Sequence, residues 1–186
     1  MLKIAITGNI ASGKSQVEQI LLDMGYKVFD TDKIAHECLE NSTEVKEAFS
    51  DYDIWEEDKI SRKKLGDIVF NNKNLRQKLN NIIHPIVRTK ILEIFEQYKN
   101  EKYVFISIPL LFESNMQNLF DKIILIYCND KIRLERLIRR NNITKEEALA
   151  RMNSQLSQEN KLNKCDYIVK NESDISELTK QIKELF

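Results

Sequence analysis

The chain has 186 residues, and its 29 lysines and arginines balance its 29 aspartates and glutamates, so its formal net charge is zero. This length suits one α/β core rather than two independent domains. Proteins that bind nucleic acids or membrane surfaces usually carry a basic excess, so the charge balance argues against both kinds of partner.

The cysteines and the apolar runs indicate the compartment. Cys38, Cys128 and Cys165 are odd in number, far apart and without the spacing of metal ligands. Three reduced thiols are typical of cytosolic proteins, in which disulfides are rare. No apolar run approaches membrane-spanning length, and the N-terminus lacks the pattern of a signal peptide. We therefore expect a soluble, cytoplasmic protein.

Five short apolar segments predict the strands of one sheet. They are residues 3–7, 27–30, 104–108, 122–127 and 167–169. Helical patterns lie between these segments, which predicts a parallel sheet with helices on both faces. Ser173 and Asp174 can cap a last helix that packs on this sheet.

The stretch between the second and third predicted strands holds no convincing strand. Its helical patterns cover residues 34–39, 45–49, 62–70, 75–83 and 85–98. A helical insertion at this place is a suitable position for a part of the protein that recognises one substrate.

The most informative motif directly follows the first predicted strand. It matches the phosphate loop G-x-x-x-x-G-K-[ST] and consists of Gly8, Asn9, Ile10, Ala11, Ser12, Gly13, Lys14 and Ser15. Glycines let backbone N–H groups converge on a phosphate, and the following helix N-terminus adds partial positive charge. Lys14 can reach the outer phosphates, and the Ser15 hydroxyl can bind Mg²⁺. The motif therefore predicts binding of a nucleoside triphosphate rather than an ordinary helix-capping turn.

Two carboxylates follow the second predicted strand. Ligands of parallel sheets gather outside the carboxyl ends of the strands, so Asp30 and Asp32 should face the same crevice as the phosphate loop. A carboxylate there can accept the proton of an attacking hydroxyl. Asp32 could instead cap the helix that begins near Ile34. Both can hold if one aspartate is the cap and the other is catalytic.

An arginine series follows the fourth predicted strand. Arg133, Arg136 and Arg140 share one face of a predicted helix, and a capping-box signature at residues 144–147 opens the next helix. The pattern predicts a helical hairpin that presents arginines to a transferring phosphate, in the manner of a mobile flap. The alternative is a solvated basic face, which we favour for Arg133 and Arg139.

Two further motifs could line a ligand site. Proline disfavours helical geometry in the residue before it, so His84-Pro85 predicts a corner between two helices. His84 could contact a ligand at this corner or simply fix its shape. Residues 109–113, Pro-Leu-Leu-Phe-Glu, would either fill the core or form an apolar wall of an acceptor pocket.

Together these motifs resemble those of the dephospho-coenzyme A kinases, which complete coenzyme A synthesis. The resemblance covers almost the whole chain. It rests on Thr7 with the phosphate loop, residues 30–32, 83–86 and 109–113, Arg136 and Arg140 with Arg151 and Gln155, and residues 165–169 followed by Asn171. The phosphate loop alone occurs in many proteins, whereas the D-T-D, H-P and P-L-L-F-E motifs together are far more specific.

The resemblance implies a fold, a substrate and cofactors. The fold is α/β, the three-layer P-loop nucleoside/nucleotide-kinase-like fold, with a five-stranded parallel sheet in a single kinase domain of residues 1–186. The implied parts are a core (about 1–31, 100–130 and 160–186), a helical acceptor-binding insertion (about 32–99) and a helical lid (about 131–159). The implied reaction uses ATP and Mg²⁺ to phosphorylate the ribose 3′-hydroxyl of dephospho-coenzyme A, a small-molecule substrate.

The resemblance also implies residue roles. Asp32 would act as base towards the acceptor hydroxyl, while Thr7, Lys14 and Arg140 would stabilise the transferring phosphoryl group. The ATP site would comprise residues 8–15 with Arg136 and Asn171, and Ser15 would bind the metal. The acceptor side would be lined by Asp32, His84, Leu111, Phe112 and Glu113.

The sequence departs from the family pattern at several positions. Asn9 and Ala11 stand where the family usually has glycine, and Cys165 replaces alanine. Ser107 occupies a strand position where many relatives carry a carboxylate. The sequence therefore names no second protein ligand for Mg²⁺, and water could serve.

Two alternative functions fit the same motifs. One is another small-molecule or nucleotide kinase with a different acceptor in the insertion. The other is a nucleotide-dependent switch without net phosphate transfer, against which the missing D-x-x-G motif and the acid after the second strand argue. Release of ADP only in the presence of an acceptor distinguishes a kinase from a switch.

Overall fold

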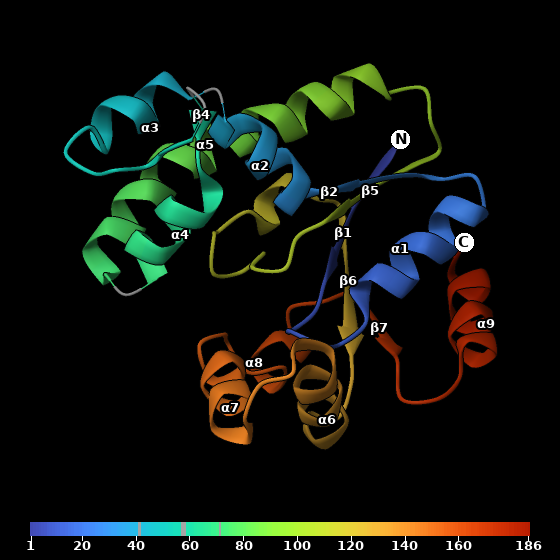
Figure 1. Ribbon diagram of the computed structural model, residues 1–186. Helices are drawn as coiled ribbons and strands as arrows, with labels where there is room; N and C mark the ends of the chain where they lie inside the picture. The colour runs from blue at the N-terminus through green and yellow to red at the C-terminus, as the bar shows by residue number, and fades with distance from the viewer. Residues whose placement is uncertain (41, 57–58, 71) are drawn as a thin grey trace. The chain divides into compact units, whose positions relative to one another are not determined.

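A computed structural model describes residues 1–40, 42–56, 59–70 and 72–186 (Figure 1). The chain forms two compact units. The first comprises residues Met1–Phe29 and Tyr98–Phe186, and the second comprises residues Asp30–Gln97. Across the described ranges, no helix is both long enough and apolar enough to pass through a membrane.

The main sheet has the five strands that the sequence predicts. They are β1 (Leu2–Thr7), β2 (Lys27–Asp30), β5 (Tyr103–Ser107), β6 (Lys122–Tyr127) and β7 (Tyr167–Lys170). The strand order is β2-β5-β1-β6-β7, and the pairs β1–β5, β1–β6 and β6–β7 are parallel. The predicted α/β class with a parallel sheet is confirmed.

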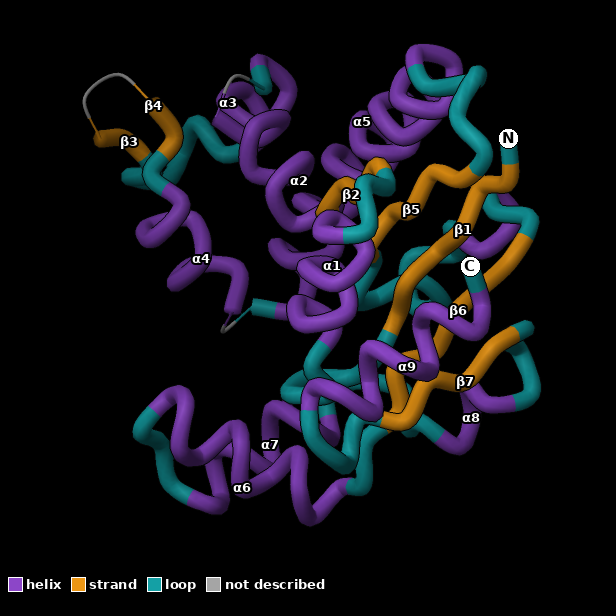
Figure 2. The backbone as a smooth tube through the Cα atoms, turned by 90° about the vertical axis from the view of Figure 1, so that its right-hand side faces the viewer, coloured by secondary structure: helices purple, strands orange, loops and turns teal. Residues whose placement is uncertain are grey.

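One face of this sheet is covered by the first and last helices of the chain. Helices α1 (Lys14–Asp23) and α9 (Ile175–Leu185) contact each other, and Figure 2 shows them side by side. Asp174 caps α9, as predicted, by accepting a 3.0 Å hydrogen bond from the Glu177 N–H. The buried cluster between helices and sheet contains Ile4, Ile6, Val17, Ile20, Leu21, Phe105, Ile124, Ile126, Val169, Leu178 and Ile182.

The predicted helical hairpin after β6 is present in the first unit. It consists of α6 (Asp130–Asn141) and α7 (Lys145–Asn153), and the short helix α8 (Glu159–Leu162) follows. Thr144 and Glu147 form the predicted capping box, since each side chain accepts from the backbone N–H of the other residue. A one-turn 3₁₀ helix, η1 (Gln117–Leu119), precedes β6.

The second unit is mainly helical. It contains α2 (Thr31–Glu40), α3 (Thr43–Ala48), α4 (Arg62–Phe70) and α5 (Lys73–Gln97), and α5 packs against the other three. The prediction that this stretch holds no strand is wrong in one detail. Two-residue strands β3 (Trp55–Glu56) and β4 (Lys59–Ile60) pair in antiparallel fashion, too briefly for any sequence period to reveal them.

The predicted corner at His84-Pro85 is also wrong, because α5 continues through the proline. Proline removes one backbone hydrogen bond from a helix. The buried residues Ile83, Val87, Ile91 and Phe95 recur every four positions across Pro85, so the packing face is continuous. Burial of this face offsets the lost bond, which outweighs the local preference of the residue before a proline.

Candidate active site

The phosphate loop connects β1 to α1, which is the strand–loop–helix context that the motif predicts. A tight turn starts the loop, in which the Ser12 N–H donates to the Asn9 carbonyl at 3.0 Å. Gly13, the residue directly before α1, has φ +91°, and Ala11 has φ +62°. Such positive φ values are natural for glycine and costly for alanine.

Both glycines of the loop are required by close neighbours. A Cβ atom on Gly8 would lie 2.6 Å from the Ser12 hydroxyl and 2.8 Å from the Ile126 carbonyl oxygen. A Cβ atom on Gly13 would collide with the side-chain amide of Asn171. The signature glycines therefore serve close packing as well as backbone freedom.

The loop offers donors and positive charge to an anion. The first N–H groups of α1 have no acceptor within the helix, and the first turn of α1 contains no acidic residue. Lys14 is partly buried and forms no ion pair with any carboxylate in the described ranges. The hydroxyls of Thr7 and Ser12 are buried and have no hydrogen-bond partner among the described residues. Phosphate oxygens would satisfy these groups.

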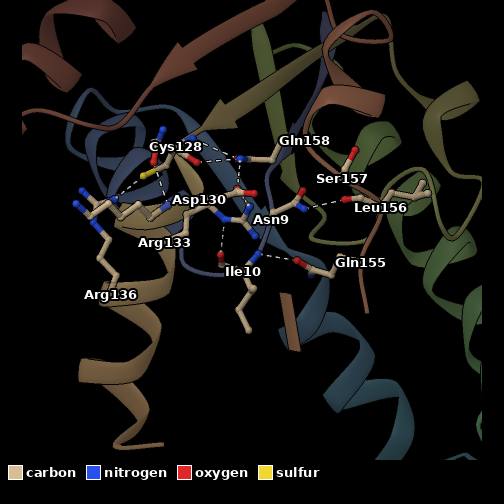
Figure 3. A network of polar contacts seen from close by, with 12 residues as sticks. Asn9, Ile10, Cys128, Asp130, Arg133, Arg136, Gln155, Leu156, Ser157 and Gln158 are labelled. Atoms are coloured by element: carbon tan, nitrogen blue, oxygen red, sulfur yellow. Dashed lines mark hydrogen bonds and ion pairs between the residues drawn. The ribbon is translucent and has the colours of Figure 1, made fainter. Parts of the chain in front are cut away.

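Three contacts hold the loop from the side of the helical hairpin (Figure 3). The Ile10 N–H donates to Oε1 of Gln155 at 2.7 Å, and the Ile10 carbonyl accepts from Nε of Arg133 at 3.0 Å. The side-chain amide of Asn9 donates to the Leu156 carbonyl at 2.7 Å. Both backbone polar groups of Ile10 thereby have partners within the protein. These contacts hold the loop in place, and the Ile10 N–H is not available to a phosphate.

Apolar packing adds to these polar contacts. Leu137, Ala148 and Met152 of the hairpin form a small buried cluster, against which Ile10 and Ala11 of the loop pack. The phosphate loop and the hairpin thus share one apolar cluster, and a shift of either changes the surroundings of the other.

The preference for a solvated Arg133 is wrong. Its side chain is only 3% exposed, and its NH1 group lies 2.6 Å from Oδ1 of Asp130 in addition to the bond with Ile10. A buried arginine is stable only with such partners. Arg139 is exposed, as expected for a solvated face.

Arg136 and Asn171 lie together beside the loop. The Arg136 guanidinium donates to the Asn171 carbonyl at 3.1 Å and to Sγ of Cys128 at 3.4 Å. The Asn171 side chain is buried and donates to the Ser12 carbonyl and to Gln16, each at 2.9 Å. Both predicted ATP-site residues therefore belong to the surroundings of the loop, and their contact with nucleotide stays a prediction.

Arg140 lies near the exposed end of α6. Its Nε donates to the Asn141 side chain at 2.9 Å, and the arginine is exposed to solvent. An exposed arginine at a helix end can swing towards a bound phosphate. Its predicted action on the transferring phosphoryl group is not tested by this arrangement.

The segment after β5 is anchored to the first unit. Leu111 is fully buried and Phe112 is partly buried, with Lys164 5.6 Å above its ring. Glu113 accepts from the Leu156 N–H at 3.1 Å and pairs at 3.0 Å with Lys161, whose side chain is fully buried. Leu111 thus fills the core, the first of the two options, and the predicted contact of Phe112 and Glu113 with an acceptor stays a prediction.

Asp30, the last residue of β2, and Asp32, the second residue of α2, have different local roles. Asp30 caps α2, because its carboxylate accepts a 2.8 Å hydrogen bond from the Asp32 N–H. Asp32 itself lies in the first turn of α2 and is exposed. Of the two arrangements left open by the sequence, the structure has Asp30 as the cap. A carboxylate so placed remains accessible to a substrate hydroxyl.

His84 lies within α5 rather than at a corner. Its ring is partly buried, and desolvation lowers the pKa of the imidazole below its usual 6.5. The ring is therefore neutral at pH 7 and can both donate and accept a hydrogen bond.

The surroundings of Ser15 suit a magnesium ion that is bound mainly by phosphates and water, rather than a metal held by protein ligands alone. Ser15 is exposed in the first turn of α1. In the described part of the chain, no cluster of three or more His, Cys, Asp or Glu side chains could hold a metal. Mg²⁺ at nucleotide sites usually takes only one or two protein ligands, with phosphates and waters as the others. A single hydroxyl beside bound phosphates is consistent with that pattern.

Sequence reasoning missed the contacts that Arg133 and Leu156 make with the loop. Their contacts join segments that lie far apart in the chain, such as Arg133 and Ile10 across 123 residues. The fully buried Lys161, which pairs with Glu113, was also missed, because no local pattern marks this lysine for burial.

The comparisons with known proteins identify the family. A family model described as "Dephospho-CoA kinase" matches residues 2–177. The chain belongs to this family. A dephospho-CoA kinase of Staphylococcus haemolyticus is 41% identical over 187 aligned residues, which cover 98% of this chain and 93% of that protein.

Solved structures agree with the family assignment. The dephospho-CoA kinase from Campylobacter jejuni is 37% identical with a TM-score of 0.77, covering 98% of this chain and 94% of that one. TT1252 from Thermus thermophilus is 30% identical with a TM-score of 0.86, covering 99% and 95%. The predicted kinase fold and the resemblance to dephospho-CoA kinases are confirmed.

Proposed function

We propose that this chain transfers the γ-phosphoryl group of ATP to the ribose 3′-hydroxyl of dephospho-CoA, giving CoA and ADP. The observation that carries the proposal is the complete phosphate loop between β1 and α1, in a chain that the dephospho-CoA kinase model matches from residue 2 to residue 177. The proposal deepens the family assignment by naming the reacting groups.

The phosphate loop binds the triphosphate of ATP. The amides of the first turn of α1 and the Lys14 ammonium hold the β- and γ-phosphates. The buried hydroxyl of Thr7, which lacks a partner among the described residues, donates to a phosphate oxygen. Arg136 and Asn171 complete the nucleotide side, and Arg140 stabilises the charge that develops on the transferring group.

Asp32 is the base of the reaction. Its carboxylate accepts the proton of the 3′-hydroxyl while the hydroxyl oxygen forms a bond to the γ-phosphorus, and the bond to the β–γ bridging oxygen breaks. ADP leaves with the electrons of that bond. The exposed position of Asp32 in the first turn of α2, with Asp30 as the cap, supports this role.

We also propose that the reaction uses Mg²⁺, with Ser15 as a ligand. The ion, when bound with ATP, neutralises charge on the β- and γ-phosphates. His84, Phe112 and Glu113 line the acceptor side. The helical insertion 32–99 recognises the acceptor, the hairpin region 131–159 serves as the lid, and the protein works in the cytoplasm on a small molecule.

The test is a panel of acceptors read by coupled ADP release. The panel contains dephospho-CoA, adenosine, nucleoside monophosphates, shikimate and gluconate. Dephospho-CoA should be strongly preferred, and adenosine should be much poorer, because binding energy from the remote pantetheine arm orients the reacting hydroxyl. Preference for another member of the panel would overturn the proposed acceptor, and ADP release without any acceptor would contradict a kinase.

A further inference from the structure

A carboxylate and a hydroxyl meet between α1 and β5. The Ser107 hydroxyl donates a 2.5 Å hydrogen bond to Oε1 of Glu18. Ser107 is the last residue of β5 and is only 1% exposed, whereas Glu18 is partly buried on α1. Both residues belong to the first unit.

This contact lies next to the phosphate loop. Ser107 pairs in register with Ile6, the strand residue two positions before the loop glycine Gly8. Glu18 is one helical turn after Lys14 and Ser15 and shares their side of α1. Helix side chains lean towards the N-terminus of their helix, so the Glu18 carboxylate reaches back towards the phosphate-binding end.

A carboxylate at this place conflicts with a bound triphosphate unless a cation lies between them. Like charges at short range repel, and partial burial strengthens the repulsion. A hydrogen bond from Ser107 delocalises the charge of Glu18 without removing it. A divalent cation removes the conflict, because it attracts the carboxylate and the phosphates together.

Enzymes with a phosphate loop commonly hold Mg²⁺ with the loop serine or threonine and with a carboxylate from a neighbouring strand. Here the neighbouring strand β5 ends in a serine, and the carboxylate bonded to that serine comes from α1. We propose that Glu18 is the second protein ligand of the magnesium ion of Mg·ATP, held in place by Ser107. This inference rests on the proposed use of Mg·ATP.

The competing explanation is that Glu18 only ties α1 to β5. Glu18→Gln separates the two explanations, because the glutamine oxygen can still accept from Ser107 while the charge is lost. If Glu18 is only a structural tie, Mg²⁺ should raise the ATP affinity of Glu18→Gln as much as it raises that of the natural protein. If Glu18 is a metal ligand, Mg²⁺ should raise the ATP affinity of the variant less.

The experiment measures ATP affinity by isothermal titration calorimetry, with Mg²⁺ and with EDTA, and without acceptor. In Mg²⁺, Glu18→Gln should bind ATP at least about tenfold more weakly than the natural protein. In EDTA, its affinity should be equal or higher, since the repulsion is gone. The matched control is Asp23→Asn, which removes an exposed carboxylate bonded to Gln19 on the same helix and should leave both affinities unchanged.

The proposal would be overturned if Mg²⁺ raised the ATP affinity of Glu18→Gln and of the natural protein by the same factor. If Glu18→Gln does not fold, Glu18→Asp keeps the charge and shortens its reach by one methylene group. This variant should bind ATP more weakly in Mg²⁺ and unchanged in EDTA, and an unchanged Mg²⁺ affinity would count against the metal role. The measurement needs no acceptor, so it stands even if dephospho-CoA proves to be the wrong substrate.

Discussion

The backbone N–H of Ile10 donates a 2.7 Å hydrogen bond to Oε1 of Gln155, across 145 residues of sequence. Gln155 follows α7, so the bond ties the phosphate loop to the end of the helical hairpin. The next loop residue, Ala11, has φ +62°, a strained value for alanine. Strain of this kind persists only where the surroundings fix the backbone, which is what Gln155, Arg133 and Leu156 do here.

Gln155→Met should therefore raise the KM for ATP by about tenfold, because the Ile10 N–H loses its acceptor and the loop loses a constraint. The KM for dephospho-CoA should change less. Steady-state kinetics measures both KM values, and thermal unfolding measures the stability of the variant.

Gln181→Met is the matched control for this change. Gln181 also accepts from a backbone N–H, that of Lys170 at 2.9 Å, but at the edge strand β7. The Gln181→Met variant should lose stability to a similar extent as Gln155→Met, and its KM for ATP should be unchanged. Identical kinetic effects of the two variants would show that the Gln155 bond serves stability alone.

Lys14→Ala should lower turnover by roughly 10²–10³, because a preorganised charge on the phosphates is lost. Its thermal unfolding should stay close to that of the natural protein, because Lys14 has no ion pair with the described carboxylates to lose. Near-normal turnover by the folded variant would contradict the assignment of the phosphate loop.

Asp30 and Asp32 should differ in function. Asp32→Asn should bind both substrates and lose roughly 10²–10⁴ in turnover, because asparagine cannot accept the proton. Asp30→Ala should instead destabilise the protein by about 1 kcal/mol, because α2 loses its cap. Turnover and denaturant unfolding of both variants check the pair, and full turnover by Asp32→Asn would remove Asp32 as the base.

Two arginines of α6 should also differ. Arg133→Met should lower the free energy of unfolding by about 1–3 kcal/mol, because it leaves the Ile10 carbonyl without its donor. Arg140→Ala should leave stability unchanged and lower turnover more than ATP affinity, since it acts on the transferring phosphate. The exposed Arg139 is the control, and an Arg139→Ala variant as impaired as Arg140→Ala would indicate a generic basic face.

The thiol of Cys165 should be unreactive at neutral pH. Burial, with the Asp166 charge adding to it, raises the pKa of this thiol to about 11. Because the pKa is raised on folding, the thiol form favours the folded state, and this stability is lost as pH rises from 9 to 11. Pulse labelling followed by mass spectrometry should find Cys165 labelled far more slowly at pH 8 in the folded than in the unfolded protein.

Local signals in the sequence predicted most elements of the fold. The apolar strands, the phosphate loop, the capping box at Thr144 and the cap at Asp174 each depend on neighbouring residues. The misses depend on contacts that local signals do not encode. Arg133 is buried because its guanidinium donates to the Ile10 carbonyl and pairs with Asp130. Helix α5 continues through Pro85 because its buried face extends beyond the proline.

The strand order also determines when this protein can first bind its nucleotide. β1 is the central strand of the sheet and carries the phosphate loop, yet its neighbours β5 and β6 begin only at Tyr103 and Lys122. Chains emerge from the ribosome N-terminus first, and contacts between distant segments form slowly. The loop near the start of the chain must therefore wait for more than half of the protein to be synthesised before it acquires its shape. A chain released before β5 would carry the whole signature motif but no strand that pairs with β1.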